Sequence, residues 1–510
     1  MPKTALPPAP VLLTGDAVEG LEGTTLDTGT LSAAGPSETI AFTLIDTFDH
    51  AVTGAGALAL VLGDELVLIR PGAPMQRQPA AAPDYVEAMP EGPVTAALAT
   101  CVPPVRRLVA VQSGEATRQE LDLKLVDGAV AARIRTTLLI SADGGIATLV
   151  EATDHAARKP LKALLRMIAA RGTPAAGDLR ALLTAPEKLY TSKPAIAMTG
   201  DETAYRAATD ICRAHLAVAT RNEPGVIADL DIEYLHDHRV ALRRVRSVLS
   251  LFKGVYAPTQ TEKLKARFSA LMAQTGRLRD LDVQLQDRAC TRALVPAEMR
   301  PGLDLLFDRF AAERAAAQTA LAARLSSEAH AAEIADLEAI LASARRLRKG
   351  PDANRDAHDY AQKLVWARYR KVCKIAAGID DTTPDAQVHR LRIQCKKLRY
   401  LLEFFAPLFD PAALKKPVKQ LKRLQDRLGR FNDHSVQQQA LREVAAALDP
   451  ESDGAIEIAT AIGALVTVLN QRQAAERAQI VESFSDFVSD RTRRDLREVF
   501  KPAATAKGGA

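Results

Sequence analysis

The feature that most constrains the fold is an internal repeat in the second half of the chain. The segment YLHDHRVALRRVRSVLSLF, residues 234–252, is matched 153 positions later by QVHRLRIQCKKLRYLLEFF, residues 387–405. With the same shift, GRLRDLDV at 276–283 aligns without a gap with GRFNDHSV at 429–436. This agreement in position and chemistry predicts a duplicated helical unit, in which each copy forms a bundle of about four helices.

Each copy of the repeated segment carries an apolar stripe beside a basic stripe when it is placed on a helical wheel at about 100° per residue. The apolar stripes are Leu235, Leu242, Val245, Leu249 and Phe252 in the first copy and Val388, Leu391, Leu398, Leu402 and Phe405 in the second. The basic stripes are His236, Arg239, Arg243 and Arg246, and His389, Arg392, Lys396 and Arg399. The pattern predicts helices that dock by the apolar stripe, and a pseudo-twofold pairing would let both basic stripes line one groove.

Such basic stripes are unfavourable without a partner, because like charges three and four residues apart on a helix repel each other by a few tenths of a kcal/mol. A bound polyanion would relieve this repulsion, and arginine forks suit phosphate oxygens. The alternative interpretation is a solvated helix surface, which is what most charge runs are. Repetition of the same histidine and basic positions in both copies favours anion binding.

Charge is distributed unevenly along the 510 residues. The first 200 residues hold 17 Lys and Arg against 21 Asp and Glu, whereas the remaining residues hold 50 against 41. This asymmetry suggests a polyanionic partner for the second half.

The five cysteines are scattered without a C-x-x-C pair, which favours a reducing compartment. No apolar run of about 18 residues and no convincing signal peptide is present, so we expect a cytoplasmic protein with no membrane partner.

The predicted fold class is α+β. Alternating runs at 38–46, 57–69 and 118–140, with hairpin dipeptides at Gly63-Asp64 and Asp127-Gly128, predict an antiparallel barrel or sheet. We expect this β domain over 11–172, closed by a helix at 155–172, and a connector over 173–203. We expect an all-helical domain over 204–500, with halves of about 204–345 and 355–500, and a disordered tail over 501–510.

At the repeated helices the sequence resembles the CHAD family, the conserved histidine α-helical domain. The resemblance rests on NEPGVIADLDIEYLHDHRVALRRVRSVLSLF (222–252), its second copy at 388–405 and the two segments that follow, and it covers about 205–500. It implies two pseudo-symmetric four-helix bundles and a surface that binds inorganic polyphosphate, often on polyphosphate granules. Carried over residue by residue, the implied binding set is His236, Arg239, Arg243, Arg244 and Arg246 with His389, Arg392, Lys396, Lys397 and Arg399. Arg277, Arg430, Lys419 and Lys422 are weaker candidates.

In this family a CYTH domain, of the triphosphate tunnel metalloenzyme group, commonly precedes the CHAD domain, and LIDTFDHAVTGAGALALVL at 44–62 is similar to a CYTH segment. CYTH activity requires a glutamate-x-glutamate-x-lysine motif on the first strand, and none occurs near this N-terminus. The nearest pattern, Glu120, Asp122 and Lys124, comes too late in the chain. We therefore expect a degenerate CYTH-like domain with no catalytic residues, no metal and no cofactor.

Two alternatives remain open. One is a metal-dependent triphosphatase that uses the front domain with magnesium or manganese. The other is a nucleic-acid-binding protein, although only Trp366 and Tyr369 are plausible stacking residues near the basic stripes. The sequence does not fix the oligomeric state or the preferred polyphosphate length.

Overall fold

The computed structural model of the chain describes residues 9–154, 158–380, 383–487 and 489–501. Most of the predicted tail, residues 502–510, lies outside the described residues. The chain divides into two compact units, the first ending at Ser192 and the second beginning at Lys193. Within the described part of the chain, no helix combines the length and apolar character needed to cross a bilayer.

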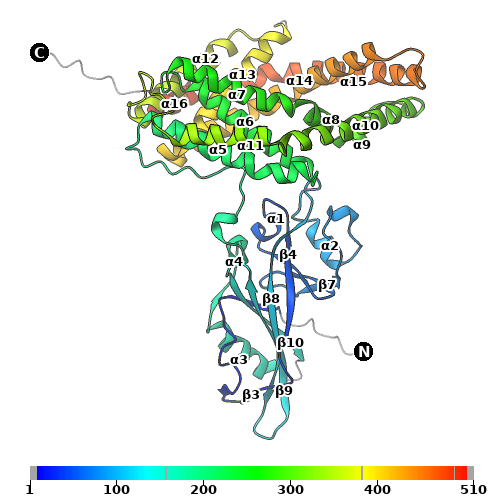
Figure 1. Ribbon diagram of the computed structural model, residues 1–510, viewed down its shortest axis with the longest axis vertical. Helices are drawn as coiled ribbons and strands as arrows, with labels where there is room; N and C mark the ends of the chain where they lie inside the picture. The colour runs from blue at the N-terminus through cyan, green and yellow to red at the C-terminus, as the bar shows by residue number, and fades with distance from the viewer. Residues whose placement is uncertain (1–8, 155–157, 381–382, 488, 502–510) are drawn as a thin grey trace, which may run out of the picture. The chain divides into compact units, whose positions relative to one another are not determined.

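The first unit is built on an antiparallel sheet in the order β11-β1-β10-β9-β8-β4-β5-β6-β7, with β3 paired to both β2 and β8 (Figure 1). Its strands are β1 (Val11–Thr14), β2 (Thr25–Leu26), β3 (Gly29–Ala33), β4 (Glu38–Asp46), β5 (Leu58–Leu62), β6 (Glu65–Ile69), β7 (Gln76–Pro79), β8 (Val109–Lys124), β9 (Val130–Ser141), β10 (Ile146–Asp154) and β11 (Thr173–Pro174). Both predicted turns are confirmed, since Gly63-Asp64 joins β5 to β6 and Asp127-Gly128 lies between β8 and β9. The two glycines adopt positive φ angles, which a tight hairpin requires.

The sheet curls into a half-barrel. Arg77 on β7 donates to Glu65 on neighbouring β6 and to Glu151 on β10, at 2.6 Å each, although five strands separate β7 from β10 along the sheet. Short helices α1 (Ala51–Gly54), α2 (Pro93–Leu98), α3 (Arg158–Ala169) and α4 (Arg180–Leu183) accompany it. Leu161, Leu164 and Ile168 of α3 are buried in one of its apolar clusters. This architecture is compatible with a CYTH-like fold.

The second unit is helical, with α5 (Ala204–Ile227), α6 (Ile232–Leu251), α7 (Pro258–Gln274), α8 (Gly276–Gln286), α9 (Arg288–Arg292), α10 (Arg300–Leu325) and α11 (Glu328–Ala342) in its first half. The second half contains α12 (Ala357–Ala376), α13 (Asp385–Phe404), α14 (Pro411–Ala447), α15 (Ala455–Phe487) and α16 (Asp490–Phe500). A shift of 153 superimposes both ends of α6 on those of α13 and the start of α5 on that of α12. Four segments therefore correspond: α5 with α12, α6 with α13, α7 and α8 with α14, and α10 with α15.

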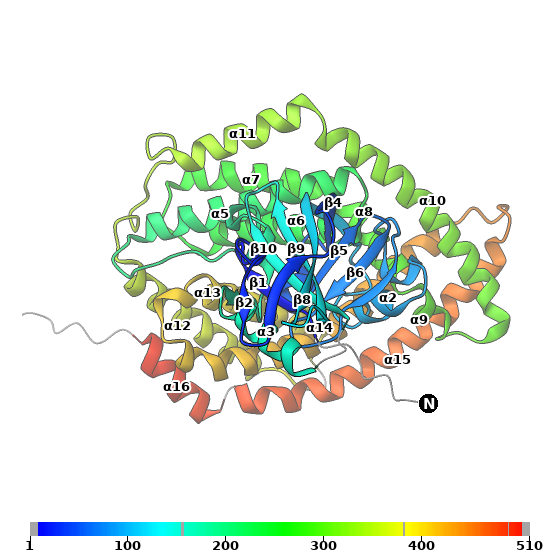
Figure 2. The same cartoon turned by 90° about the horizontal axis from the view of Figure 1, so that it is seen from below.

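The two halves are related by an approximate twofold axis, because equivalent residues contact each other reciprocally. The Ala204 amide donates to the Arg355 carbonyl at 2.8 Å, and the equivalent Ala357 amide donates to the equivalent Glu202 carbonyl at 2.9 Å. The rings of Phe252 and Phe405, again equivalent residues, stack at 4.8 Å. Figure 2 shows α5, α6, α7 and α11 on one side of this unit and α12, α13, α15 and α16 on the other.

A candidate polyanion-binding site

The two repeated helices dock as the helical wheel predicts. All ten apolar-stripe residues are at most 3% exposed: four on each of α6 and α13, with Phe252 and Phe405 directly after the two helices. Asp231 caps α6 by accepting the Glu233 and Tyr234 amides, and Pro384 precedes α13. The helix axes are therefore fixed by core packing, and the basic stripes emerge at the edge of that core.

The two basic stripes meet where α6 and α13 face each other. The Arg243 Nε on α6 donates to the Tyr400 hydroxyl on α13 at 3.2 Å, and the Lys396 Nζ lies 5.9 Å from the centre of the same ring. Arg243 and Lys396 are equivalent residues of the repeat, so this meeting lies at the pseudo-twofold axis. We call Arg239, Arg243, Arg392, Lys396 and Arg399 the axial basic cluster.

The charges of the axial basic cluster act on one another. Burial, followed by the positive charges of Arg243, Arg392 and Arg399, lowers the pKa of Lys396 to about 8. Burial likewise lowers the pKa of Arg239, and the charges of Arg243 and Arg279 add to that effect. The fold therefore holds several cations closer together than their mutual repulsion favours.

Acidic neighbours offset only part of this charge. Arg392 lies 3.6 Å from Asp433, and Asp280, the equivalent residue of the first half, raises the pKa of Arg239. Arg399 pairs with Glu403 at 3.1 Å. Arg239 also donates to the Met272 carbonyl and the Thr275 hydroxyl, at 3.1 and 2.6 Å. These two bonds sit at the break between α7 and α8, which the second half lacks because α14 runs through the equivalent position.

Arg244 occupies a different environment from the other predicted arginines. Its residue surface is 9% exposed, and its guanidinium pairs with Glu403 of the other half at 2.8 Å. The Arg244 guanidinium also lies 5.9 Å from the Tyr400 ring centre. The structure thus places Arg244 in an ion pair that links the two halves.

The remaining predicted residues are spread more widely. His236 is half-buried, while the exposed His389 contacts the Asn432 side chain through its Nδ1. The Arg246 guanidinium lies 3.2 Å from the Met272 sulfur. The exposed Arg277 and Arg430 pair with Glu313 and Glu476, respectively.

Three predicted lysines lie on α13 and α14. Lys419 and Lys422 are exposed on α14. Burial, and then the charges of Arg368, Lys371 and Lys253, lower the pKa of the Lys397 ammonium. Since Arg368 and Lys371 belong to α12, Lys397 points toward that helix.

Sequence reasoning missed Tyr400 and Glu403, which organise the meeting of the two helices. Their equivalents in the first copy are Ser247 and Ser250, so the repeat alignment gives no sign of their role. The pattern of acid and base on α13 gives a partial signal, because Arg399 and Glu403 have the i,i+4 spacing of a helical ion pair.

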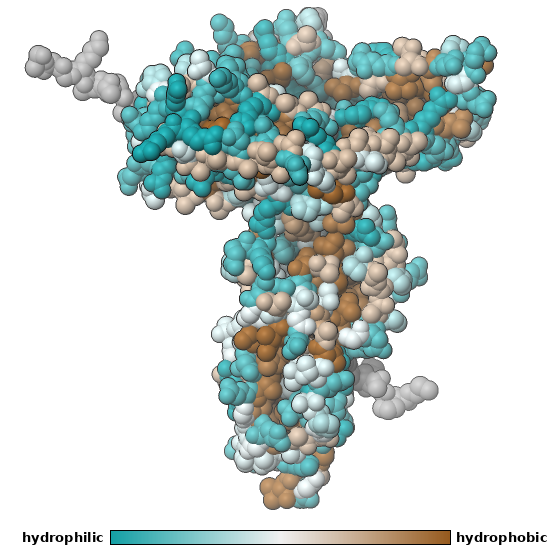
Figure 3. Space-filling view, in the orientation of Figure 1, coloured by the Kyte–Doolittle hydropathy of each residue, from teal (hydrophilic) through white to brown (hydrophobic). Residues whose placement is uncertain are grey.

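In the first unit, charged side chains also gather on one face of the half-barrel, but they largely neutralise one another. Glu120 pairs with Arg135 at 2.8 Å, and Asp122 pairs with Arg133 at 2.6 Å. The two carboxylates that could have held a metal ion, Glu120 and Asp122, are therefore each paired with an arginine. Figure 3 shows hydrophobic residues along the middle of the visible face of this unit, between hydrophilic margins.

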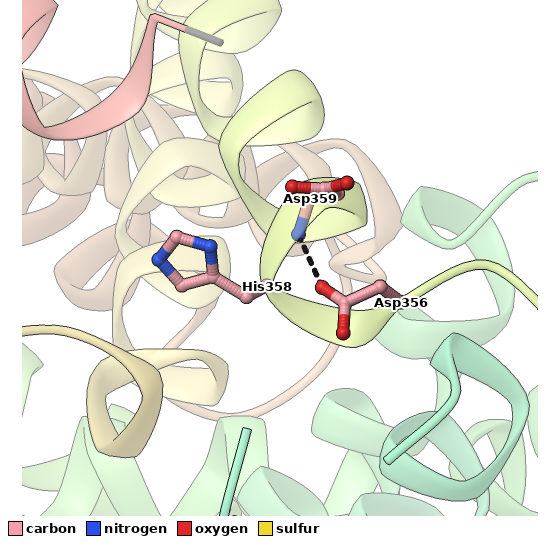
Figure 4. A group of neighbouring side chains, drawn as sticks. All are labelled: Asp356, His358 and Asp359. Carbon is pink, nitrogen blue, oxygen red and sulfur yellow. Dashed lines mark hydrogen bonds between the residues drawn. The ribbon is translucent and has the colours of Figure 1, made fainter. Parts of the chain in front are cut away.

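Among the described residues, one group of His and acidic side chains is close enough together to hold a metal ion, namely Asp356, His358 and Asp359. Asp356 is the N-cap of α12 and accepts the Asp359 amide at 2.9 Å, as Figure 4 shows. The His358 ring packs on Phe409 at 4.8 Å. Helix capping and ring packing account for these positions without a metal.

A cavity of about 540 Å³ lies among α8, α9, α10, α14 and α15. Its walls are mainly apolar, with Leu303, Phe307 and Leu465 among them, and it includes none of the predicted binding residues. The axial basic cluster is therefore a separate feature of the helical unit.

Comparison with known families matches residues 210–442 to the CHAD domain. Among solved structures, the chain is similar to the CHAD domain from the plant Ricinus communis, at 30% identity over 57% of this chain and 94% of that chain, with a TM-score of 0.48. It is also similar to PptA from Streptomyces chartreusis, at 18% identity over 56% of this chain and 100% of that chain, with a TM-score of 0.44. No curated protein matches it. With its repeated basic helices and this family match, the chain belongs to the CHAD family.

Proposed function

We propose that the axial basic cluster binds inorganic polyphosphate. The observation that carries the proposal is the meeting of equivalent cations, Arg243 and Lys396, at the pseudo-twofold axis. Burial and then the charges of Arg243, Arg392 and Arg399 depress the pKa of Lys396 there. A polyanion bound there would replace repulsion by charge-assisted hydrogen bonds, each of about 1.5–3 kcal/mol.

The extent of the cluster favours a chain of phosphates over a single one. Arg392 and Arg399 are seven residues apart on α13, which corresponds to about 10 Å of helix. On α6, Arg239 and Arg243 are four residues apart. A linear polyanion could contact both helices in succession, with arginine forks on its oxygens.

Nucleic acid is the less favoured polyanion. Of the two stacking residues that the sequence offers, Tyr369 is 1% exposed and Trp366 is half-buried, and Tyr400 beside the cluster is 4% exposed. Buried rings offer no face to a nucleobase, and stacking is a main source of affinity for single strands. Bare polyphosphate needs only the cations.

A triphosphatase activity of the first unit has no specific observation in its favour. Glu120 and Asp122 are paired with Arg135 and Arg133, so metal binding would have to displace both arginines. The proposed role is accordingly that of a binding protein. Association with polyphosphate granules in the cytoplasm follows from this role as an expectation.

The test is a titration with long-chain polyphosphate over a range of salt concentrations. The test variant is Arg243→Gln/Lys396→Gln, and the matched control is Lys159→Gln/Lys162→Gln, which removes two exposed charges from α3 of the first unit. We expect a steep salt dependence for the natural sequence and the control, and a marked loss of affinity in the test variant. Duplex DNA of equal total charge should compete poorly. Equal affinity of test variant and control would refute the assignment.

A further inference from the structure

A second group of cations lies on the other side of α13, between that helix and α12. It consists of Lys253, Arg368, Lys371 and Lys397, and we call it the α12–α13 basic cluster. Lys253 follows the end of α6, and its carbonyl accepts the Tyr360 hydroxyl of α12 at 2.7 Å. Three separate segments of the chain therefore bring these four residues together.

Side-chain contacts fix the geometry of this cluster. Arg368 on α12 donates to the Gln394 side chain on α13. Lys397 lies three residues after Gln394 and Lys371 three residues after Arg368, so each lies one helical turn from that bond, on the facing surfaces. Lys253 and Lys371 are exposed, while Arg368 and Lys397 are half-buried.

The α12–α13 basic cluster lacks acidic partners. Among the described residues, none of its four members forms an ion pair, and the one hydrogen bond from Arg368 goes to a neutral amide. The pKa of Lys397 is lowered by burial and then by the charges of Arg368, Lys371 and Lys253. Holding four cations in this way costs folding free energy and returns none through pairing.

The first half of the repeat shows that the fold does not require these charges. At the equivalent positions it has His215 for Arg368, Val218 for Lys371 and Arg244 for Lys397. Burial and then the charge of Arg244 lower the pKa of His215 to about 3, which leaves it neutral, and Glu403 neutralises Arg244. These positions thus carry no unpaired charge in the first half and three unpaired cations in the second, where Lys253 adds a fourth.

We infer that the α12–α13 basic cluster is a second polyphosphate subsite, so that a long chain leaves the axial basic cluster on one side only, across α13 and onto α12. This inference rests on the proposed function. Lys396 and Lys397 are adjacent on α13, and they point toward the two clusters. A chain that passes over α13 would contact both, whereas the neutralised first half offers no matching extension.

The experiment compares Lys253→Ala/Lys371→Ala with the control Lys159→Ala/Lys162→Ala. Both variants remove two exposed lysines, so both should fold. With long-chain polyphosphate, each lost contact with a flexible polyanion should reduce the slope of log K against log salt by about 0.7. The test variant loses two contacts, so its slope should be shallower by about 1.4. The control should keep the natural slope. Tripolyphosphate, held by the axial basic cluster, should bind the test variant and the control alike.

The outcomes separate this inference from the proposed function. If the natural sequence does not bind polyphosphate, both fail. If it binds, and Arg243→Gln/Lys396→Gln weakens binding while Lys253→Ala/Lys371→Ala keeps the natural slope, the second subsite is overturned and the axial site stands. If Lys253→Ala/Lys371→Ala makes the salt slope shallower for long-chain polyphosphate but leaves tripolyphosphate binding unchanged, the result supports the one-sided path.

Discussion

The proposed binding of polyphosphate should depend on pH through Lys396. Its pKa in the free protein is about 8, because it is buried and surrounded by Arg243, Arg392 and Arg399. A polyanion favours the charged ammonium and raises this pKa in the complex. Above pH 8 the protein must therefore take up a proton in order to bind, and the affinity should fall about tenfold, or about 1.4 kcal/mol, for each further pH unit.

The same group has the opposite effect on folding. A lysine whose pKa is lower in the folded chain than in the unfolded chain is destabilising while both states are protonated. Between pH 8 and the unfolded value near 10.5, the unfolded state binds the additional proton, so the contribution of Lys396 to stability rises with pH. The gain is at most about 3 kcal/mol. Stability and polyphosphate affinity should thus change in opposite directions over one pH window.

The assay is polyphosphate affinity measured from pH 6.5 to 10 at constant ionic strength, alongside urea unfolding at the same pH values. Lys396→Arg keeps its charge throughout this range and should remove the fall in affinity, because an arginine side chain stays protonated. Lys396→Gln should bind more weakly at neutral pH and show no fall. An equal decline of affinity in Lys396→Arg and the natural sequence would refute the role of Lys396.

Three further predictions concern the fold and the first unit. Arg244→Ala should leave Glu403 without its partner across the two halves and lower the free energy of unfolding by about 1.5–3 kcal/mol in urea titrations; no change would show that the pair is not structural. Phe405→Ala should cost about 3–5 kcal/mol, because it empties one side of the stacked pair at the pseudo-twofold axis; a change below 1 kcal/mol would mean that the halves repack around the loss. Glu120→Gln/Asp122→Asn should leave polyphosphate affinity unchanged, and loss of a metal-dependent phosphate release in this variant would instead support the triphosphatase alternative.

The sequence predicted the elements of the helical unit closely, because the repeat constrains them twice. The stripe of buried residues on α6 and its copy on α13 follow from helical periodicity alone, and the two helices have equivalent ends. The hairpins at Gly63 and Asp127-Gly128 were also predictable, since tight turns need residues that accept positive φ. β7 and β10 were not among the predicted strands. A barrel or sheet was predicted, but the half-barrel depends on long-range contacts such as Arg77–Glu151, which joins residues 74 positions apart.

The sequence by itself thus determined a duplicated helical unit with two basic stripes, and the tertiary structure alone decided how those stripes are used. A helical wheel gives the direction of a side chain around its own axis but not the neighbour that it meets. Only the packing of α6 on α13 brings Arg243 close to Tyr400 and Lys396. The same packing forms the ion pair between Arg244 and Glu403, which are 159 residues apart. Coulomb energies depend on distance and burial, so cations at equivalent positions of the repeat can have different environments. Arg244 is paired with Glu403, whereas the equivalent Lys397 lies among other cations.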